Sequence, residues 1–320
     1  MEIEEQRSRF VGSLLGVAFG DTLGAAVEML SRTEIRDQFG QVRDFLPHAK
    51  GFGCYTDDTE MTLALVLSLI QQGRIDAAYC ARCYAEAFTP ERGYGRSASR
   101  IMEELAAGTD YRQTGTMFFP AGSFGNGAAM RIAPIGLLYG RGKETQLREA
   151  VSSAVSCTHI HDEAVETAFL QALAVGLMLD LPAGVRLDMC AITEQLIISC
   201  RNEEIKQRLE TVEELLITGA DADRVVDCFS CGVRSGDSWP PALWAALRFS
   251  DDPEEAIIQA VNLGGDADTI GAMTGALVGA LYGDSWFPQR WFDSLENGVN
   301  GRDEIIKCGQ LMAELAVSLK

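Results

Sequence analysis

The sequence has little positive charge. Against 46 Asp and Glu residues it carries only 27 Lys and Arg, which gives a formal net charge of −19 over 320 residues. A nucleic-acid-binding surface needs a basic patch or stripe to neutralise phosphates, and the sequence contains no such stripe. We therefore expect no direct nucleic-acid partner. We interpret the excess carboxylates as a solvated surface together with the ligands of a cation site.

Long apolar runs and linkers are also missing. The uncharged segment Thr269–Gly283 has only 15 residues, whereas a membrane span requires roughly 20, so no membrane association is expected. Its glycines Gly271, Gly275 and Gly279 recur at four-residue spacing, which predicts a core helix with one small face against a neighbour. Because no Pro/Ser-rich stretch divides the chain, residues 1–320 are predicted to form a single compact domain.

The sequence has no cationic leader and no strong zinc motif. The segment Met1–Glu5 is acidic where a signal peptide needs positive charge, so we expect a cytoplasmic protein whose nine Cys are reduced, partly buried thiols. The pairs Cys80/Cys83 and Cys228/Cys231 have zinc-ligand spacing. The first pair, however, lies in a pattern that predicts continuous helix, whereas zinc knuckles normally lie in tight turns.

What the sequence does contain is helical periodicity nearly throughout. No long segment alternates apolar and polar residues as a half-buried strand would. Apolar residues make up 47% of the chain, enough for a large core, and the fold class is predicted to be all-α. The clearest helical patterns cover Phe10–Phe19, Met61–Ile70, Ala164–Leu181, Glu203–Leu216 and Glu254–Leu263.

Two short acidic runs are the most informative feature. Thr56–Thr59 and Gly264–Thr269 each lead directly into an apolar helical pattern, and carboxylates are favoured at helix starts by the free backbone N–H groups and the helix dipole. Both runs offer only hard oxygen ligands, which suit Mg²⁺, Mn²⁺ or Ca²⁺ better than zinc or copper. If the fold brings them together, they form a two-metal site; the alternative is that Asp and Thr only cap two helices.

Three further segments contain residues typical of binding or catalytic sites. Gly20–Glu28 places a carboxylate beyond a Gly-rich turn, Pro90–Gly95 is a turn before a helical pattern, and Gly122–Arg131 is a run of small residues before a helix. Backbone N–H groups in such a loop can bind phosphate or ribose oxygens. Phe118 and Phe124 flank the loop, where they either sandwich a flat base or close the core.

Taken together and in this order, these motifs resemble the ADP-ribosylglycohydrolases, an all-helical family that cleaves ADP-ribose from modified proteins and related conjugates. The resemblance extends from Phe10 to Gly283. It rests on the two acidic runs, Gly20–Glu28, Arg92–Gly95 and Ser123–Arg131. The last motif, with Thr158–His159 downstream, is most similar to the branch that acts on ADP-ribosylserine and poly(ADP-ribose), and it implies an orthogonal helical bundle.

The resemblance also implies roles for individual residues. Two Mg²⁺ ions, for which Mn²⁺ can substitute, would be held by Thr56, Asp57, Asp58, Asp266, Asp268 and Thr269. ADP-ribose would contact Gly93, Gly95, Phe118, Ser123, Phe124, Gly125, Asn126, Gly127 and His159, with adenine stacked on the two Phe. Phe124 stands where the serine branch commonly has Tyr, and Val27 replaces an aromatic residue; the stretch 201–231 shows no motif that can be aligned.

The implied enzyme is a Mg²⁺-dependent hydrolase that cleaves the glycosidic bond at ribose C1″, acting on O-linked ADP-ribosylserine and extending to poly(ADP-ribose) or O-acetyl-ADP-ribose. Glu28 is the candidate acid–base group because it stands outside the paired runs, with a metal-bound Asp as the alternative and Asp21 interpreted as a structural cap. We expect a monomer whose partner is an ADP-ribosylated protein or conjugate. An ADP-ribosylarginine hydrolase and a non-catalytic ADP-ribose-binding or structural protein remain alternatives. A third possibility is a Mg²⁺-dependent phosphohydrolase, because paired Asp and phosphate-binding loops also fit phosphoryl transfer, although no Gly-Lys-Ser/Thr phosphate loop is present.

Overall fold

Helices form the fold throughout the part of the chain that the computed structural model describes, residues 2–183 and 185–319. The all-α prediction is confirmed: no described residue belongs to a strand, and only the isolated bridges Ser31–Gly264 and Gly125–Arg234 occur. The elements are α1 (Ile3–Gly24), α2 (Arg32–Phe39), α3 (Asp57–Gln72), α4 (Ala77–Ala87), the 3₁₀ turn η1 (Pro90–Arg92), α5 (Arg96–Ala106), α6 (Tyr111–Thr114), α7 (Gly127–Met130), α8 (Ala133–Tyr139), α9 (Glu144–Val155), α10 (Asp162–Asp180), α11 (Met189–Ser199), α12 (Glu203–Thr218), α13 (Ala222–Phe229), α14 (Ser235–Arg248), α15 (Pro253–Val261), α16 (Ala267–Tyr282), α17 (Gln289–Ser294) and α18 (Arg302–Ser318).

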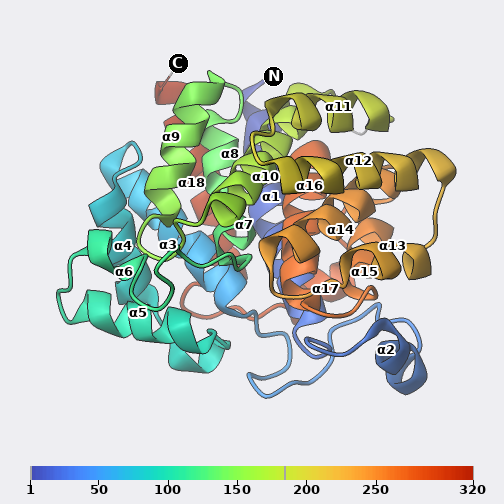
Figure 1. The fold of residues 1–320 in the computed structure, drawn as a ribbon, viewed down its shortest axis with the longest axis horizontal. Coiled ribbons are helices and arrows are strands. Elements are labelled where there is room, and N and C mark those ends of the chain that lie inside the picture. The colour runs from blue at the N-terminus through green and yellow to red at the C-terminus, as the bar shows by residue number, and fades with distance from the viewer. Residues whose placement is uncertain (1, 184, 320) are drawn as a thin grey trace.

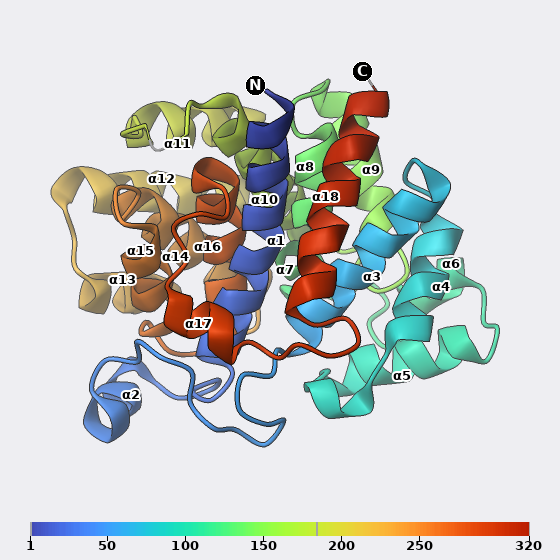
Figure 2. The same ribbon diagram turned by 180° about the vertical axis from the view of Figure 1, so that it is seen from behind.

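Helices α1 and α16 form the centre of the molecule and lie side by side along most of their length (Figures 1 and 2). The small face predicted for α16 packs against α1, where Gly12, Gly16 and Gly20 oppose Gly279, Gly275 and Gly271. A Cβ atom on Gly16 would lie 2.1 Å from the carbonyl oxygen of Gly275, so only glycine permits this approach. Since the opposed numbers rise on one helix and fall on the other, the helices are antiparallel.

This antiparallel pair positions the candidate site. It brings the carboxyl end of α1 to the amino end of α16, where a Cβ on Gly24 would lie 2.4 Å from the Cα of Asp268. Helices α18 and α3 cover α1 on one side, and α10, α14 and α15 cover α16 on the other (Figure 2). The end of α1, and with it Asp21, therefore lies next to the second acidic run.

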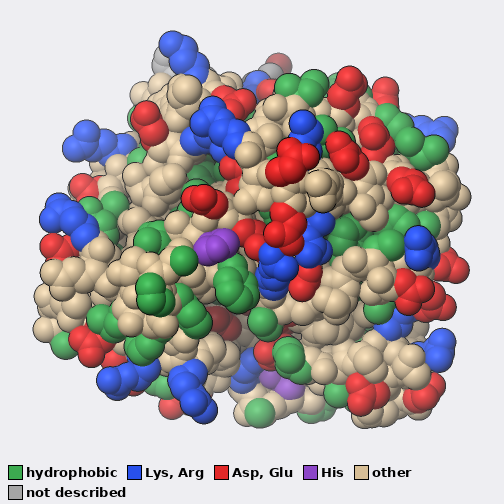
Figure 3. Space-filling model, viewed as in Figure 1, with side chains coloured by type: hydrophobic (Ala, Val, Ile, Leu, Met, Phe, Trp, Pro, Cys, Tyr) green, Lys and Arg blue, Asp and Glu red, His purple; other side chains and the backbone are tan. Residues whose placement is uncertain are grey.

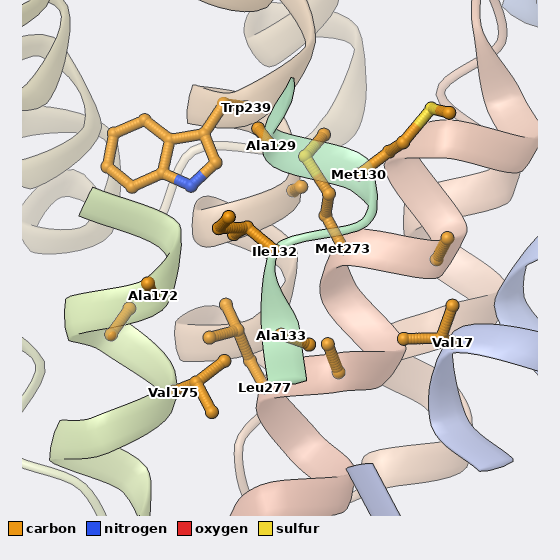
Figure 4. Packing of buried hydrophobic residues seen from close by; sticks show 14 of the residues in the cluster. Val17, Ala129, Met130, Ile132, Ala133, Ala172, Val175, Trp239, Met273 and Leu277 are labelled. Atoms are coloured by element: carbon orange, nitrogen blue, oxygen red, sulfur yellow. The ribbon is translucent and has the colours of Figure 1, made fainter. Parts of the chain in front are cut away.

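The core between α16 and its neighbours is almost entirely apolar. Met273 and Leu277 of α16 face Ile132 and Val175, and the Trp239 ring closes the same cluster (Figure 4). The one polar atom of that ring is satisfied, because Trp239 Nε1 donates to Gln171 Oε1 at 2.9 Å. Dense packing of this kind gives the acidic runs a rigid support.

The predicted helices all occur, with small differences at their ends. Helix α15 stops at Val261, short of the predicted Leu263, where the backbone turns through Gly264 and Gly265 with φ of 80° and 71°. The buried Asn262 side chain donates to the Val42 carbonyl and accepts from the Val42 N–H, at 2.9 Å each. Cys80 and Cys83 lie in continuous helix α4, as predicted. Within the described residues all nine Cys are free thiols. A search of the same residues finds no helix with the length and apolar character needed to cross a membrane.

Candidate active site

The two acidic runs meet at the amino ends of α3 and α16. Thr56 is the N-cap of α3, and its hydroxyl accepts from Asp58 N at 3.4 Å; Asp266 is the N-cap residue of α16. Thr269 donates its hydroxyl to Asp58 Oδ2 at 3.3 Å, which joins the runs directly. Each run therefore begins its helix and contributes to a shared cluster, but only Thr56 makes a side-chain capping hydrogen bond, because the Asp266 side chain makes none.

Glu28 belongs to the same cluster. One oxygen from each of Glu28, Asp266 and Asp268 lies within 4.8 Å of the other two. Its position follows from the turn after α1, where Met29 N donates to the Gly265 carbonyl at 2.6 Å and Gly265 N donates to the Leu30 carbonyl at 2.8 Å. The carboxylate that stands apart in sequence is thus tied by backbone hydrogen bonds to the second acidic run.

Asp21 has a different place, beneath the start of α3. Its carboxylate accepts from Thr56 N at 2.9 Å and from Thr59 N at 3.0 Å, and also from the Thr59 hydroxyl at 2.5 Å. Burial raises the pKa of Asp21 to about 6, against the lowering effect of these hydrogen bonds. Asp21 is therefore a structural cap, but it caps the neighbouring helix α3 rather than its own.

The cluster has an excess of negative charge. Desolvation, followed by the Asp21 carboxylate, raises the pKa of Asp57 to about 8. Burial also raises the pKa values of Asp58 and Asp268 well above the usual range, with the neighbouring carboxylates adding to the effect. Among the ion pairs of the described residues, only Lys50 Nζ contacts this group, 3.6 Å from Glu28 Oε2. One ammonium leaves the charge of the other carboxylates unbalanced.

The donor set fits a hard divalent cation. Asp58 Oδ1 is buried and has no hydrogen-bond partner among the described residues, although buried carboxylate oxygens are normally paired. A cation would satisfy this oxygen and would also hold the neighbouring carboxyl groups ionised. Carboxylate and hydroxyl oxygens without a sulfur or imidazole donor suit Mg²⁺ or Mn²⁺.

A cleft of about 350 Å³ opens above the cluster. In the space-filling view, acidic side chains are recessed behind hydrophobic ones in the lower half of this face (Figure 3). Most of the residues predicted as ligands line the cleft: Glu28, Asp57, Asp58, Gly93, Gly95, Ser123, Gly125, Asn126, Gly127, His159, Asp266, Asp268 and Thr269. A larger cavity of about 480 Å³, near Phe10 and Arg141, contains none of these described residues and is a separate feature.

Three predicted residues lie just outside this lining. Thr56 is fully buried beneath the cluster. Phe118 lines a small adjoining pocket of about 60 Å³ together with Phe119. Phe124 is 48% exposed at the rim, where its ring meets His161 edge-on with centroids 5.8 Å apart. The aromatic side chain that lines the cleft itself is Phe119.

The loop Ser123–Gly127 is held from both sides. Asn126 N donates to the Val233 carbonyl at 3.0 Å, and Ser235 N donates to the Phe124 carbonyl at 3.0 Å. The Asn126 side-chain amide donates to Asp266 Oδ2 and, at 3.1 Å, to the Ser238 hydroxyl. The loop predicted to bind phosphate is thereby linked directly to the predicted metal cluster.

His159 is a neutral group at the base of this loop. Burial, and then the nearby Arg131 guanidinium, lowers the pKa of His159 to about 3. Its Nδ1 lies 2.7 Å from the Thr158 hydroxyl, and its ring occupies the space that a Cβ on Gly127 would need, with Cε1 2.8 Å away. A histidine in this state serves as a hydrogen-bonding group and not as the general acid of a reaction near neutral pH.

The opposite wall is formed by the turn that carries Gly93. Gly93 has a φ of +98°, which favours glycine, and a Cβ there would lie 2.5 Å from Lys50 Nζ. The buried Glu60 anchors this turn, because it accepts from the Tyr94 hydroxyl at 2.7 Å and from Thr89 N at 3.0 Å. The glycine of this motif thus provides room for a lysine.

Sequence reasoning missed several residues of the cleft. Phe119 and Val233 line the cleft, and Lys50 lies next to it against Glu28. In the segment Ser230–Ser235, the Cys231 carbonyl accepts from Asp266 N at 2.7 Å. Ser230 and Cys231 both adopt left-handed backbone conformations, with φ of 56° and 55°. The contacts of the segment Ser230–Ser235 with the site use backbone atoms, so the sequence gives no side-chain signal for them. Phe119 has one signal, since it is the neighbour of Phe118.

Comparisons with known proteins agree with this geometry. A family model described as ADP-ribosylglycohydrolase matches residues 2–319. The chain is 30% identical to ADP-ribosylhydrolase ARH3 of Bos taurus, over 90% of this chain and 89% of that protein. It is 33% identical to an uncharacterized protein of Archaeoglobus fulgidus, over 90% and 92%. A solved structure titled ADP-ribosylglycohydrolase-related protein complex superposes with a TM-score of 0.74 at 28% identity, covering 98% of this chain and 99% of that one.

Proposed function

The chain belongs to the ADP-ribosylglycohydrolase family and is a hydrolase of glycosidic bonds, and on that premise we propose that it is a Mg²⁺-dependent enzyme that removes ADP-ribose from O-linked ADP-ribosylserine. The bond cleaved is the one at ribose C1″, and poly(ADP-ribose) and O-acetyl-ADP-ribose are further substrates of the same chemistry. The observation that carries the proposal is the convergence of both acidic runs and Glu28 below the loop Ser123–Gly127.

The proposed metal ligands are Thr56, Asp57, Asp58, Asp266, Asp268 and Thr269, which would hold two Mg²⁺ ions or, in their place, Mn²⁺. Such ions would supply Lewis-acid chemistry, which would orient ribose hydroxyls and increase the acidity of a nearby water. The unpaired Asp58 Oδ1 supports this assignment, as does the elevated pKa of the Asp57 carboxyl without a counter-ion.

The chain's own residues bind and orient the remainder of ADP-ribose. Ser123, Gly125, Asn126 and Gly127 contact the diphosphate and ribose, with Gly93, Gly95 and the neutral His159 completing the subsite. Adenine is proposed to stack between Phe118 and Phe124, and the nearby Phe119 excludes water from the cleft. Aromatic faces at a rim suit a flat base, because stacking requires no hydrogen-bond partner.

Glu28 is the proposed acid–base residue. During hydrolysis the oxygen of water forms a bond to C1″ while the C1″–O bond to serine breaks. The carboxylate accepts the proton of the water and passes it to the serine oxygen, so the products are free ADP-ribose and an unmodified serine. Its position at the cleft, 34% exposed and next to the Asp266–Asp268 pair, supports this role.

We also propose that residues 1–320 act as one domain and as a cytoplasmic monomer, with an ADP-ribosylated protein or conjugate as partner. One continuous set of buried apolar side chains, from Phe10 to Ala316, supports the single domain.

Product analysis tests the function. The purified protein would be incubated with serine-linked, arginine-linked and poly-linked ADP-ribose, with Mg²⁺ or with EDTA. Release of free ADP-ribose from the serine conjugate, abolished by EDTA, is expected. Release of AMP would instead indicate cleavage of the diphosphate bond, and activity that persists in EDTA would contradict the metal requirement.

A further inference from the structure

Lys50 is a cation held inside an acidic site. It lies in the segment between α2 and α3, and its Nζ atom is 3.6 Å from Glu28 Oε2. Its side chain is only 15% exposed, although lysine is rarely buried without a partner. On the far side it fills the space beside Gly93, where a Cβ would lie 2.5 Å from Nζ. The ammonium is therefore enclosed between the Glu28 carboxylate and the Gly93 turn.

The loop around Lys50 is anchored on both sides of it. Gly51 N donates to the His48 carbonyl at 3.0 Å, which closes a turn over the lysine, and His48 Nε2 lies 3.0 Å from the Cys54 carbonyl. The Gly53 carbonyl then accepts from Glu296 N at 2.9 Å, which fixes the loop to the segment after α17. Lys50 is thus presented by a tethered loop and is not a free surface side chain.

From this placement we propose that Lys50 is a specificity-determining residue, which disfavours substrates whose leaving group is positively charged. The inference rests on the proposed function and narrows its substrate class to conjugates with a neutral leaving group, such as a serine oxygen. In an arginine conjugate the leaving group is instead a guanidinium, which carries a positive charge and is therefore disfavoured.

An acid–base carboxylate must come within about 3 Å of the atom it protonates. If Glu28 Oε2 comes this close to the leaving atom, the leaving atom lies at most roughly 7 Å from Lys50 Nζ, because Glu28 Oε2 is itself 3.6 Å from that nitrogen. Within a partly solvated cleft, two like charges at this range still repel each other, whereas a neutral hydroxyl is not repelled by the ammonium.

Lys50 also removes an attraction. An isolated Glu28 carboxylate would bind a guanidinium well, since Arg–carboxylate pairs are strong and often bidentate. With its oxygen already paired to the lysine, Glu28 offers little net charge to such a group. Repulsion of the wrong substrate combined with loss of an attractive contact is a common basis of specificity.

The test compares two substrates, a peptide with ADP-ribosylserine and a peptide with ADP-ribosylarginine. The variants are Lys50→Met, the conservative Lys50→Arg, and the control Lys307→Met. The control removes the same charge from α18, where the Lys307 side chain is 65% exposed. The quantity measured is the ratio of kcat/KM for the arginine peptide to that for the serine peptide.

Lys50→Met should raise this ratio by about ten-fold, the size expected for loss of one nearby charge interaction in a partly solvated site. Lys50→Arg and Lys307→Met should leave the ratio within about two-fold of wild type. A ratio that is unchanged in Lys50→Met, or a fall of both rates by one common factor, overturns the inference and leaves the proposed function intact. A wild-type enzyme that cleaves neither peptide, or that prefers the arginine peptide, overturns the proposed function itself.

Discussion

Arg234 and Glu163 form a bidentate ion pair at the edge of the cleft, with Arg234 Nε 2.8 Å from Glu163 Oε1 and Nη2 2.6 Å from Oε2. The Glu163 side chain is 4% exposed and also accepts from Gly236 N at 3.0 Å. The pair therefore fastens the segment Ser230–Ser235, which contacts the loop Ser123–Gly127 on one side and Asp266 on the other. Arg234 also meets the ligand loop directly, because its backbone bridges to Gly125 and its guanidinium lies 6.0 Å from the centroid of the Phe124 ring.

Arg234→Met should consequently destabilise the protein and weaken ADP-ribose binding together. The change leaves the buried Glu163 carboxylate without its cation; for a pair that is partly exposed on the arginine side, we expect a loss of about 1–3 kcal/mol. Urea unfolding and calorimetry with ADP-ribose measure the two effects. The control is Arg100→Met, because the Arg100–Glu103 pair is more than half exposed on the arginine side and such pairs contribute under about 1 kcal/mol. Equal effects of the two variants would contradict the anchoring role.

Metal and pH should act on stability through the same carboxyl groups. Because burial raises the pKa of Asp57 to about 8 in the metal-free protein, the folded state holds a proton that the unfolded state has released above about pH 4. The metal-free protein should therefore lose stability as pH rises from 4 towards 8. Mg²⁺ should restore it most at the upper end of this range, since it binds the ionised folded state. Thermal melting in EDTA and in Mg²⁺ from pH 5 to 8 measures this; melting temperatures that are indifferent to Mg²⁺ at pH 8 would count against the metal site.

Glu28→Gln should separate binding from catalysis. The amide is nearly isosteric and should preserve the fold and much of the ADP-ribose affinity. It cannot exchange a proton usefully, so turnover should fall by about 10²–10⁴-fold. Asp268→Asn, in contrast, should impair Mg²⁺ binding and turnover together, because a proposed ligand charge is lost. Turnover of Glu28→Gln within a few-fold of wild type on every conjugate would transfer the acid–base role to a metal-bound Asp.

Phe124→Ala should weaken ADP-ribose binding by roughly ten-fold, since stacking of a base on an aromatic ring contributes about 1–3 kcal/mol. Phe119→Ala should have a smaller effect if that ring only excludes water from the cleft. Phe52, which is 56% exposed and is not among the cleft-lining residues, gives the control Phe52→Ala. Calorimetric affinities order the three variants, and an unchanged affinity in Phe124→Ala would place the base elsewhere.

Gly275→Ala should strongly destabilise the fold. The added Cβ would lie 1.9 Å from the Gly16 carbonyl oxygen, and since the contact is backbone on both helices, α1 and α16 must separate. Overpacking of this kind costs about 1–3 kcal/mol or more, and the separation would also move the start of α16, where Asp268 lies. Gly298→Ala, which meets no atom within 4 Å, is the control. Denaturant midpoints compare the two, and similar midpoints would show that the helices can adapt.

The sequence could predict those parts of the site in which the residue type and its local spacing already indicate a role. The sequence indicates Asp57 and Asp58 because these acidic residues precede a helical pattern, and it indicates the glycines of α16 by their spacing. The structure adds that α1 supplies the glycines opposite those of α16. It also shows that Asp21, which belongs to α1, caps the start of α3. Neither partner could be assigned from local pattern, because both contacts join residues distant in the chain.

The segment Ser230–Ser235 illustrates the other limit. It joins the ligand loop to Asp266 through backbone hydrogen bonds, and any sequence able to adopt that conformation could provide them. Lys50 was missed for a related reason, since a single lysine in an irregular loop has no periodicity to interpret.

By itself, then, the sequence determined the helical fold class, the hard-oxygen character of the proposed cation site and the identity of the carboxylates proposed to form it, because these depend on residue type and local spacing. Only the tertiary structure decided which groups face one another. The antiparallel packing of α1 on α16 brought Glu28 to Asp266 and Asp268, and the anchored loop before α3 placed Lys50 beside them. Charge interactions fall off with distance and strengthen with burial, so the electrostatic character of this site depends on an arrangement that the order of residues does not specify locally.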